Sequence, residues 1–281
     1  MLIDTHAHLD YSEFSSDLDQ VVLRARQKGV GKILTIGTGL ESSRRAVDLA
    51  GRYDEVFAVV GVHPTSVSEN VSNFRDLLRD ISIHEKVVAI GETGLDYHRL
   101  SERVLSHRRG GDESESYTGD SVEELVERDR AAQASAFKIQ LELALERGLN
   151  VVIHQREAWE ETLKVLEEFD GRVKGVFHCF GGSPEQAFEV IERGHLVSFT
   201  GIVTFKNAEN VRKTVATIPE GCFMVETDCP YLAPVPFRGN RCEPWHTVLV
   251  AEAVALSRQS DFARISRETT FAAENFFHLG R

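Results

Sequence analysis

The segment LIDTHAH (Leu2–His8) ends a short apolar run with two histidines that are two residues apart. In an extended strand, residues two positions apart point to the same face, so His6 and His8 are expected to lie side by side. Neutral imidazole is a common ligand of divalent cations, but an isolated pair of histidines also fits a packing or surface position. The pair therefore predicts a metal site only if other parts of the chain supply further ligands.

Apolar runs of this kind recur along the chain, and each is followed by polar or glycine residues and then by a helical pattern. The runs are LIDTHAH, KILTIGT, VFAVVGVHP, VVAIGETGLD, VVIHQREA, GVFHCF, LVSFTGI and FMVETDCP. Strands that alternate with helices in this way predict an α/β fold, a single (β/α)8 TIM barrel over residues 1–281. An open doubly wound sheet is disfavoured, because no Gly-x-Gly-x-x-Gly turn follows the first strand.

One helix shows how the chain marks its element ends. In GGSPEQAFEVIERG, Ser183 is expected to be the N-cap residue, with Pro184 at the first helical position. Gln186 completes a capping box with Ser183, and Gly194 is expected to end the helix. These signals support the alternation of strands and helices.

One segment interrupts that alternation. A polar stretch rich in glycine, serine and glutamate lies between Asp96 and a helix expected around Gln133–Arg147. We interpret residues 99–121 as a long, mobile loop. A lid over a site and a tolerated surface insertion are both compatible with this composition.

The overall composition is that of an ordinary globular protein, with 42% hydrophobic and 27% charged residues and a net charge of −12. The excess of acids argues against a protein that coats nucleic acid with a basic surface, although it is compatible with a nucleic-acid enzyme. No apolar run approaches the roughly 20 residues that a membrane span requires. Without a secretory signal, and with no Cys-x-x-Cys pair, the sequence predicts a cytoplasmic protein with reduced thiols. No stable protein partner is inferred from the sequence.

Side chains able to bind a metal collect at the carboxyl ends of the predicted strands, the end of a TIM barrel where active sites are built. Buried acids are rarely left without a partner, so a cation is expected among them. Six ligands exceed what one tetrahedral zinc uses and suit two dications about 3.5–4 Å apart. The six residues are His6, His8, Glu92, His154, His178 and Asp228.

The cysteines are not expected to join this site. Cys179 and Cys229 directly follow His178 and Asp228, so strand alternation is expected to turn them away as small buried apolar residues. Cys222 and Cys242 have no ligand partner at metal spacing.

Several motifs together carry a family resemblance. They are DTHAHLD, GVHP, AIGETGLDY, VVIHQREA, FHCFGG, SFTGIVTFKN and VETDCPYLAPVPFRGNRCEP, in this order along nearly the whole chain. With them the sequence resembles the TatD-type metal-dependent deoxyribonucleases, a branch of the amidohydrolase-like TIM barrels. Two features depart from the family pattern: the segment after Asp96 lengthens the interval between Glu92 and His154, and Cys242 stands where asparagine is usual.

The resemblance implies hydrolysis of DNA phosphodiesters, with single-stranded ends as substrate and 3′→5′ exonuclease polarity. It implies one metal ion at His6, His8, Glu92 and Asp228, and a second at His154 and His178. Glu92 would bridge the two ions. Mg²⁺ is the expected functional ion, and Zn²⁺ and Mn²⁺ are alternatives.

The chemistry of such a site assigns further roles. Bound dications lower the pKa of a shared water, and Asp228 is expected to accept its proton, so Asp228 and Glu92 are the predicted catalytic residues. Side chains just beyond the strand ends are the predicted phosphate contacts: His63, Arg156, Lys206 and Arg238. Lys206 and Arg238 are also compatible with plain surface charges.

Two other classes of function stay open. Hydrolysis of a C–N bond or another ester, such as D-aminoacyl-tRNA deacylation, is the enzymatic alternative. Two-metal amidohydrolases commonly bridge their ions with a carbamylated lysine on the fourth strand, a place that Glu92 takes here. A non-catalytic barrel with a structural metal is disfavoured, because structural zinc sites are closed and usually rich in cysteine.

Overall fold

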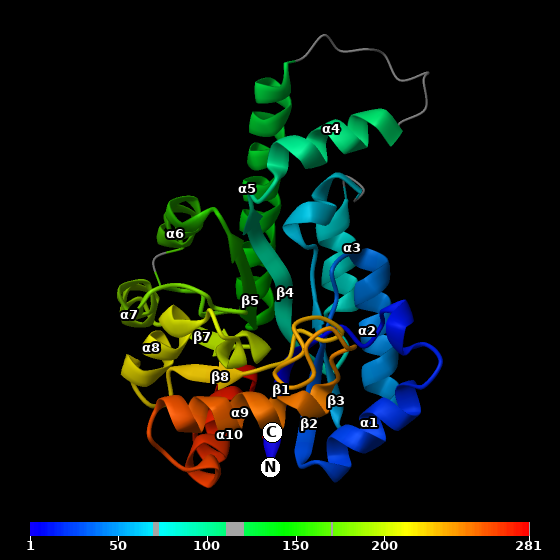
Figure 1. Cartoon of the computed structure of the whole chain (residues 1–281). Coiled ribbons are helices and arrows are strands. Elements are labelled where there is room, and N and C mark those ends of the chain that lie inside the picture. Colours follow the sequence, from blue (N-terminus) through cyan, green and yellow to red (C-terminus); the bar gives the residue numbers. More distant parts are fainter. Residues whose placement is uncertain (70–72, 111–120, 170, 281) are drawn as a thin grey trace.

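The computed structural model describes residues 1–69, 73–110, 121–169 and 171–280, and a parallel eight-stranded sheet forms its centre (Figure 1). The strands are hydrogen-bonded to one another in sequence order, and each neighbouring pair in that order is parallel. A bridge between Ala7 and Cys229 joins the first strand to the segment after the last. The predicted TIM barrel is thus confirmed. Its strands are β1 (Leu2–Ala7), β2 (Val30–Ile36), β3 (Val56–Val60), β4 (Val87–Asp96), β5 (Asn150–Arg156), β6 (Gly175–Phe177), β7 (Leu196–Phe199) and β8 (Phe223–Val225).

Helices connect the strands, and one connection contains an additional helix. A pair of helices, α4 and α5, follows β4, and another pair, α9 and α10, follows β8. The helices are α1 (Leu18–Gln27), α2 (Leu40–Arg52), α3 (Phe74–Ile81), α4 (Leu100–Gly110), α5 (Val122–Arg147), α6 (Trp159–Glu167), α7 (Pro184–Glu192), α8 (Glu209–Thr217), α9 (Thr247–Ser257) and α10 (Phe262–Phe277). Short 3₁₀ turns lie at Ser12–Phe14, Pro64–Glu69, Gly201–Thr204 and Pro244–His246.

The interpretation of residues 99–121 as a loop is wrong for its first half, which forms helix α4. Leu100 and Val104, four residues apart on one helical face, are buried, and the polar residues between them include good helix formers. The polar composition of this segment is therefore compatible with a helix as well as with a loop. The α5 helix also begins before the expected Gln133, because Ser121 and Glu124 form a capping box. In Figure 1, α4 and the first turns of α5 project beyond the rest of the molecule.

The tip between these helices, residues 111–120, lies outside the described residues. The mobility predicted around Gly110–Gly119 therefore stays a prediction. Elsewhere the local signals are confirmed: Ser183 and Gln186 form the expected capping box of α7, and Gly194 follows that helix with a φ of 86°. A positive φ is easily adopted by glycine, so the helix ends there.

The interior of the barrel is filled by side chains. One buried cluster joins Ile3 of β1, Leu34 of β2, Val152 of β5 and Met224 of β8, and it also includes Phe276 of α10. Because these strands lie on different sides of the barrel, the cluster occupies its interior. The barrel is thus a packed core. Among the described residues, no helix is both long enough and apolar enough to cross a membrane.

Candidate metal centre

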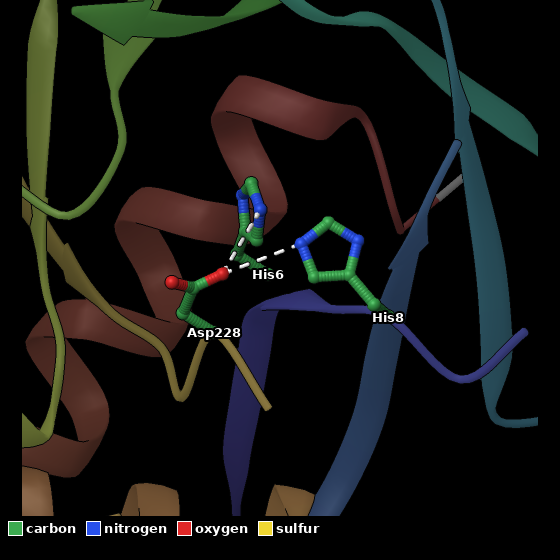
Figure 2. Close-up of side chains that lie close together, drawn as sticks. All are labelled: His6, His8 and Asp228. Carbon is green, nitrogen blue, oxygen red and sulfur yellow. Dashed lines mark ion pairs between the residues drawn. The ribbon is translucent and has the colours of Figure 1, made fainter. Parts of the chain in front are cut away.

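The closure of the barrel brings the first and last strands together at their carboxyl ends. The backbone N–H of Asp228 donates to the carbonyl oxygen of His6 at 2.8 Å, and that of His8 donates to the carbonyl oxygen of Cys229 at 2.8 Å. The Oδ1 of Asp228 consequently lies 3.6 Å from His6 Nε2 and 3.3 Å from His8 Nε2 (Figure 2). The side chains of His6 and His8 thus both lie close to the same carboxylate oxygen of Asp228.

Glu92 of β4 lies between two sets of histidines. Its Oε1 is 2.7 Å from His154 Nδ1, 2.7 Å from His178 Nε2 and 3.5 Å from His63 Nε2. Its Oε2 faces the other set, 3.4 Å from His6 Nε2. The two oxygens of one buried carboxylate therefore point to different groups of imidazoles.

Glycine in β4 makes this close approach possible. Gly94 pairs with His154 in the register of β4 and β5, and a Cβ atom at Gly94 would collide with the carbonyl oxygen of His154. Its φ of 140° is also one that residues with a side chain rarely adopt. Gly94 therefore lets the two strands approach, two residues from Glu92.

Outer partners orient the histidines. His154 Nε2 lies 3.1 Å from Asp96 Oδ2 and His8 Nδ1 lies 3.2 Å from the carbonyl oxygen of Ile36, both at hydrogen-bond distance. His178 Nδ1 lies 3.7 Å from Glu226 Oε1, which is an ion-pair distance only. A metal-binding histidine commonly uses its second nitrogen in this way. Sequence reasoning missed the roles of Asp96 and Glu226. The period-2 spacing offered a signal, because Asp96 lies four residues after Glu92 on the same face of β4.

A further buried acid supports the loop that carries Asp228. The carboxylate of Asp4 accepts hydrogen bonds from the N–H and the hydroxyl of Thr227, at 2.9 and 2.6 Å. Burial raises the pKa of Asp4 to about 8, although the bonds from Thr227 oppose the shift. Asp4 therefore positions the residue before Asp228.

The electrostatics of the cluster favour an ionised Glu92. Burial alone would raise the pKa of its carboxyl, but the surrounding imidazoles, with His178 and His63 foremost, hold it well below its usual range. Burial lowers the pKa of His63 to about 3 and also lowers that of His6, where His178 adds to the effect. Burial alone would also lower the pKa of His178, but Glu92 raises it well above its usual range, and the pKa values of His154 and His8 are likewise raised by their carboxylate neighbours. The buried carboxylate of Glu92 thus faces two imidazoles that favour the neutral form and three that favour the charged form.

The donor set fits a metal ion. Neither ring nitrogen of the fully buried His6 has a hydrogen-bond partner among the described residues, although its Nε2 points between the carboxylates of Glu92 and Asp228. Such an orphaned polar group is costly unless something binds it. In the part of the chain that the structure describes, three groups have ligand atoms within 4.8 Å of one another: His6, His8 and Asp228; His6, His178 and Glu226; and His63, Glu92 and His154. Imidazole and carboxylate ligands suit divalent cations.

The predicted phosphate contacts occupy different surroundings. His63 lies within the ligand cluster, and its Nδ1 is 2.7 Å from the hydroxyl of Thr65. Arg156, Lys206 and Arg238 are exposed near the ends of β5, β7 and β8. The guanidinium of Arg238 lies 3.6 Å from the centre of the Phe205 ring. Their contact with a substrate stays a prediction.

The four cysteines are free thiols, as expected. Cys229 is fully buried, whereas Cys179 is partly exposed, with its Sγ 3.5 Å from the hydroxyl of Thr200. The alternation argument fails at both positions, because β6 ends at Phe177 and β8 at Val225. Cys179 and Cys229 therefore lie in the turns after the strands.

Residues 3–278 match the family model described as TatD related DNase. The chain belongs to the TatD family. It is 36% identical over 280 residues to YabD of Bacillus subtilis (strain 168), named an uncharacterized metal-dependent hydrolase, with 99% of this chain and 100% of that protein covered. It is a metal-dependent hydrolase of this family, and the fit of the cluster to a metal agrees with that.

Two further TatD relatives support the assignment. The protein named 3′-5′ ssDNA/RNA exonuclease TatD of Erwinia tasmaniensis is 30% identical over 285 residues, with 99% of this chain and 100% of that protein covered. The crystal structure of the TatD homologue YjjV of Escherichia coli K12 superposes with a TM-score of 0.84 at 27% identity, covering 99% and 98% of the two chains.

Proposed function

We propose that this protein hydrolyses DNA phosphodiester bonds at single-stranded ends, as a 3′→5′ exonuclease that uses two divalent cations. The proposal rests on one observation: the two carboxylate oxygens of Glu92 face different sets of imidazoles. Oε1 faces His154 and His178, and Oε2 faces His6. A carboxylate with a separate ligand set at each oxygen is suited to bridge two ions. Two-metal centres are characteristic of phosphoester hydrolysis.

The residues divide into two ligand sets. His6, His8 and Asp228 would hold one ion, His154 and His178 the other, and Glu92 would bridge both. When bound, such a pair of ions supplies a hydroxide nucleophile near neutral pH and withdraws charge from the phosphoryl oxygens. The ligand set contains both imidazole and carboxylate, so Mg²⁺, Mn²⁺ and Zn²⁺ are the ions to test.

Asp228 is the proposed proton acceptor. Its side chain is 17% exposed, whereas that of Glu92 is 4% exposed, so Asp228 lies nearer the open mouth where a water and a substrate enter. The neighbouring His8 and His6 lower the pKa of Asp228 against the effect of burial, which keeps the carboxylate ionised. An ionised carboxylate beside the nucleophilic water can take its proton.

Cations around the mouth are proposed to hold the DNA. The protein as a whole carries a net charge of −12, so attraction of a polyanion has to be local. The exposed Arg156, Lys206 and Arg238 follow the strand ends and can contact phosphates of the strand. The name of the Erwinia relative, a 3′-5′ ssDNA/RNA exonuclease, supports the choice of a single-stranded nucleic acid.

The test uses purified protein stripped of metal and then reloaded with Mg²⁺, Mn²⁺ or Zn²⁺. Single- and double-stranded DNA labelled at the 5′ end is expected to shorten stepwise from its 3′ end, faster when single-stranded. Asp228→Asn is expected to reduce the rate by about a hundredfold or more, whereas the exposed Asp76→Asn is not. Intact DNA with all three ions, or equal activity in Asp228→Asn, would refute the proposal.

A further inference from the structure

A polar hollow of about 450 Å³ lies beside the metal centre, where β4 and β5 end and α4 begins. Two of its walls come from the strands: Asp96 and Arg156, which face each other in the register of β4 and β5. A third comes from Arg99 and Arg103, at the start of α4. That helix belongs to the segment by which this chain departs from the family pattern.

The hollow adjoins the ligand cluster on two sides. On one side, Asp96 Oδ2 lies 3.1 Å from Nε2 of His154. On the other side, the hydroxyl of Thr65 lies 2.7 Å from Nδ1 of His63, and Nε2 of the same ring lies 3.5 Å from Glu92 Oε1. A substrate whose scissile phosphate lies over the metal cluster therefore has a neighbouring group within reach of the hollow.

The spacing of the side chains suits a neighbouring phosphate. His154 and Arg156 are two residues apart in β5, so their side chains leave the same face of the strand, roughly 7 Å apart. This distance is comparable to the separation of successive phosphates along an extended nucleic-acid strand. Arg156 therefore lies at about the spacing of successive phosphates from His154, a ligand of the proposed metal centre.

The charges of the hollow favour an anion. Arg103 is engaged by acids of the protein: its guanidinium lies 3.5 Å from Asp96 and 3.4 Å from Asp129. Arg156, by contrast, has no ion pair or side-chain hydrogen bond within the described part of the chain.

Arg99 is the second available cation. It is only loosely paired, with Glu102 at 4.0 Å and both side chains more than 70% exposed. An exposed ion pair of this kind contributes little to stability, so the guanidinium of Arg99 can exchange Glu102 for a phosphate at little cost in free energy.

We propose that this hollow is a second phosphate subsite, in which Arg156 and Arg99 hold the phosphate next to the scissile one. The inference rests on the proposed phosphodiesterase function and deepens it, because it names the substrate class as nucleotides with at least two successive phosphates. Guanidinium groups bind phosphate through paired, charge-assisted hydrogen bonds. The α4 helix thereby selects an oligonucleotide over a single phosphodiester.

The test compares three small substrates of the metal-loaded protein: thymidylyl-thymidine (TpT), which has one phosphodiester, and the same dinucleotide with an added 5′-phosphate (pTpT) or 3′-phosphate (TpTp). One of the two phosphorylated forms is expected to have a kcat/KM about tenfold or more above that of TpT. The form that gains shows on which side of the scissile bond the subsite lies.

Arg99→Gln and Arg156→Gln are each expected to reduce that advantage to below about threefold. Arg52→Gln, an exposed arginine paired with Asp19 on another part of the surface, is the matched control and should retain it. Metal content and thermal unfolding of each variant show whether the change is confined to the hollow.

The outcomes separate the two proposals. Hydrolysis of TpT without an advantage for either phosphorylated form, or an advantage that persists in both arginine variants, overturns the subsite and leaves the phosphodiesterase function intact. Failure to hydrolyse all three substrates with every ion overturns the function itself, and the subsite falls with it.

Discussion

Replacing Glu92 with glutamine keeps the shape of the side chain and removes its negative charge. The carboxylate oxygens lie between 2.7 and 4.0 Å from the nitrogens of the five surrounding histidines, so the charge acts at short range on anything bound among them. Two unit charges about 4 Å apart interact by about 4 kcal/mol at an effective dielectric constant of 20. A loss of this size corresponds to roughly a thousandfold weaker binding for an ion that Glu92 contacts.

The assay measures metal and activity on the same sample. After equilibrium dialysis against Mn²⁺, the metal content of Glu92→Gln is expected to fall below that of the wild type, and phosphodiester hydrolysis is expected to fall with it. Glu41→Gln, the same substitution at an exposed acid paired with Arg44, is the control for both readings. The barrel should remain folded in circular dichroism, because its core does not depend on Glu92. A Glu92→Gln protein with full metal content and near-normal hydrolysis would refute the bridging role.

Three further predictions concern substrate binding, pH and the core. Lys206→Ala is expected to raise KM for DNA about fivefold, with metal content unchanged, because one charge-assisted phosphate contact is lost. Burial lowers the pKa of His195 to about 4, and its neutral Nδ1 accepts the N–H of Gly175. The unfolded chain binds the additional proton below about pH 6.5, so the free energy of unfolding should fall by on the order of 3 kcal/mol between pH 6.5 and 4. In urea titrations His195→Asn should flatten this dependence, and an unchanged slope would assign it to other groups. Phe137→Ala, at a fully buried position of α5, should cost about 3–5 kcal/mol in the same titrations. The 66% exposed Phe271→Ala should cost less than about 0.5 kcal/mol, and equal losses would contradict this placement of the core.

The barrel was predictable because its signal is repeated along the chain. Each β-branched run is followed by a helical pattern, and capping residues such as Ser183 mark where individual helices begin. Helix α4 was not predicted from the sequence, because its polar residues are typical of a loop as well as of a helix. Only its buried contacts at Leu100 and Val104 distinguish the two, and those depend on tertiary packing that a local pattern does not contain.

The meeting of the six predicted ligands followed from the rule that strand ends share one rim of the barrel. The arrangement of these ligands in two sets around Glu92 could not be predicted from that rule, because it depends on which carboxylate oxygen each imidazole faces. The two acids beside the histidine ligands, Asp96 and Glu226, were also not predicted from the sequence. In the sequence, Asp96 marks only the start of the inserted segment, whereas in the structure it contacts His154, and Glu226 lies at ion-pair distance from His178.

Locating the ions directly is the sharpest test of a two-metal centre. Anomalous diffraction from crystals of the wild-type protein grown with Mn²⁺ counts and places them in one measurement. A two-metal centre predicts two peaks per chain, one beside His6 and the other beside His154, each next to a different oxygen of Glu92. A single peak, or two peaks that Glu92 does not join, would contradict it.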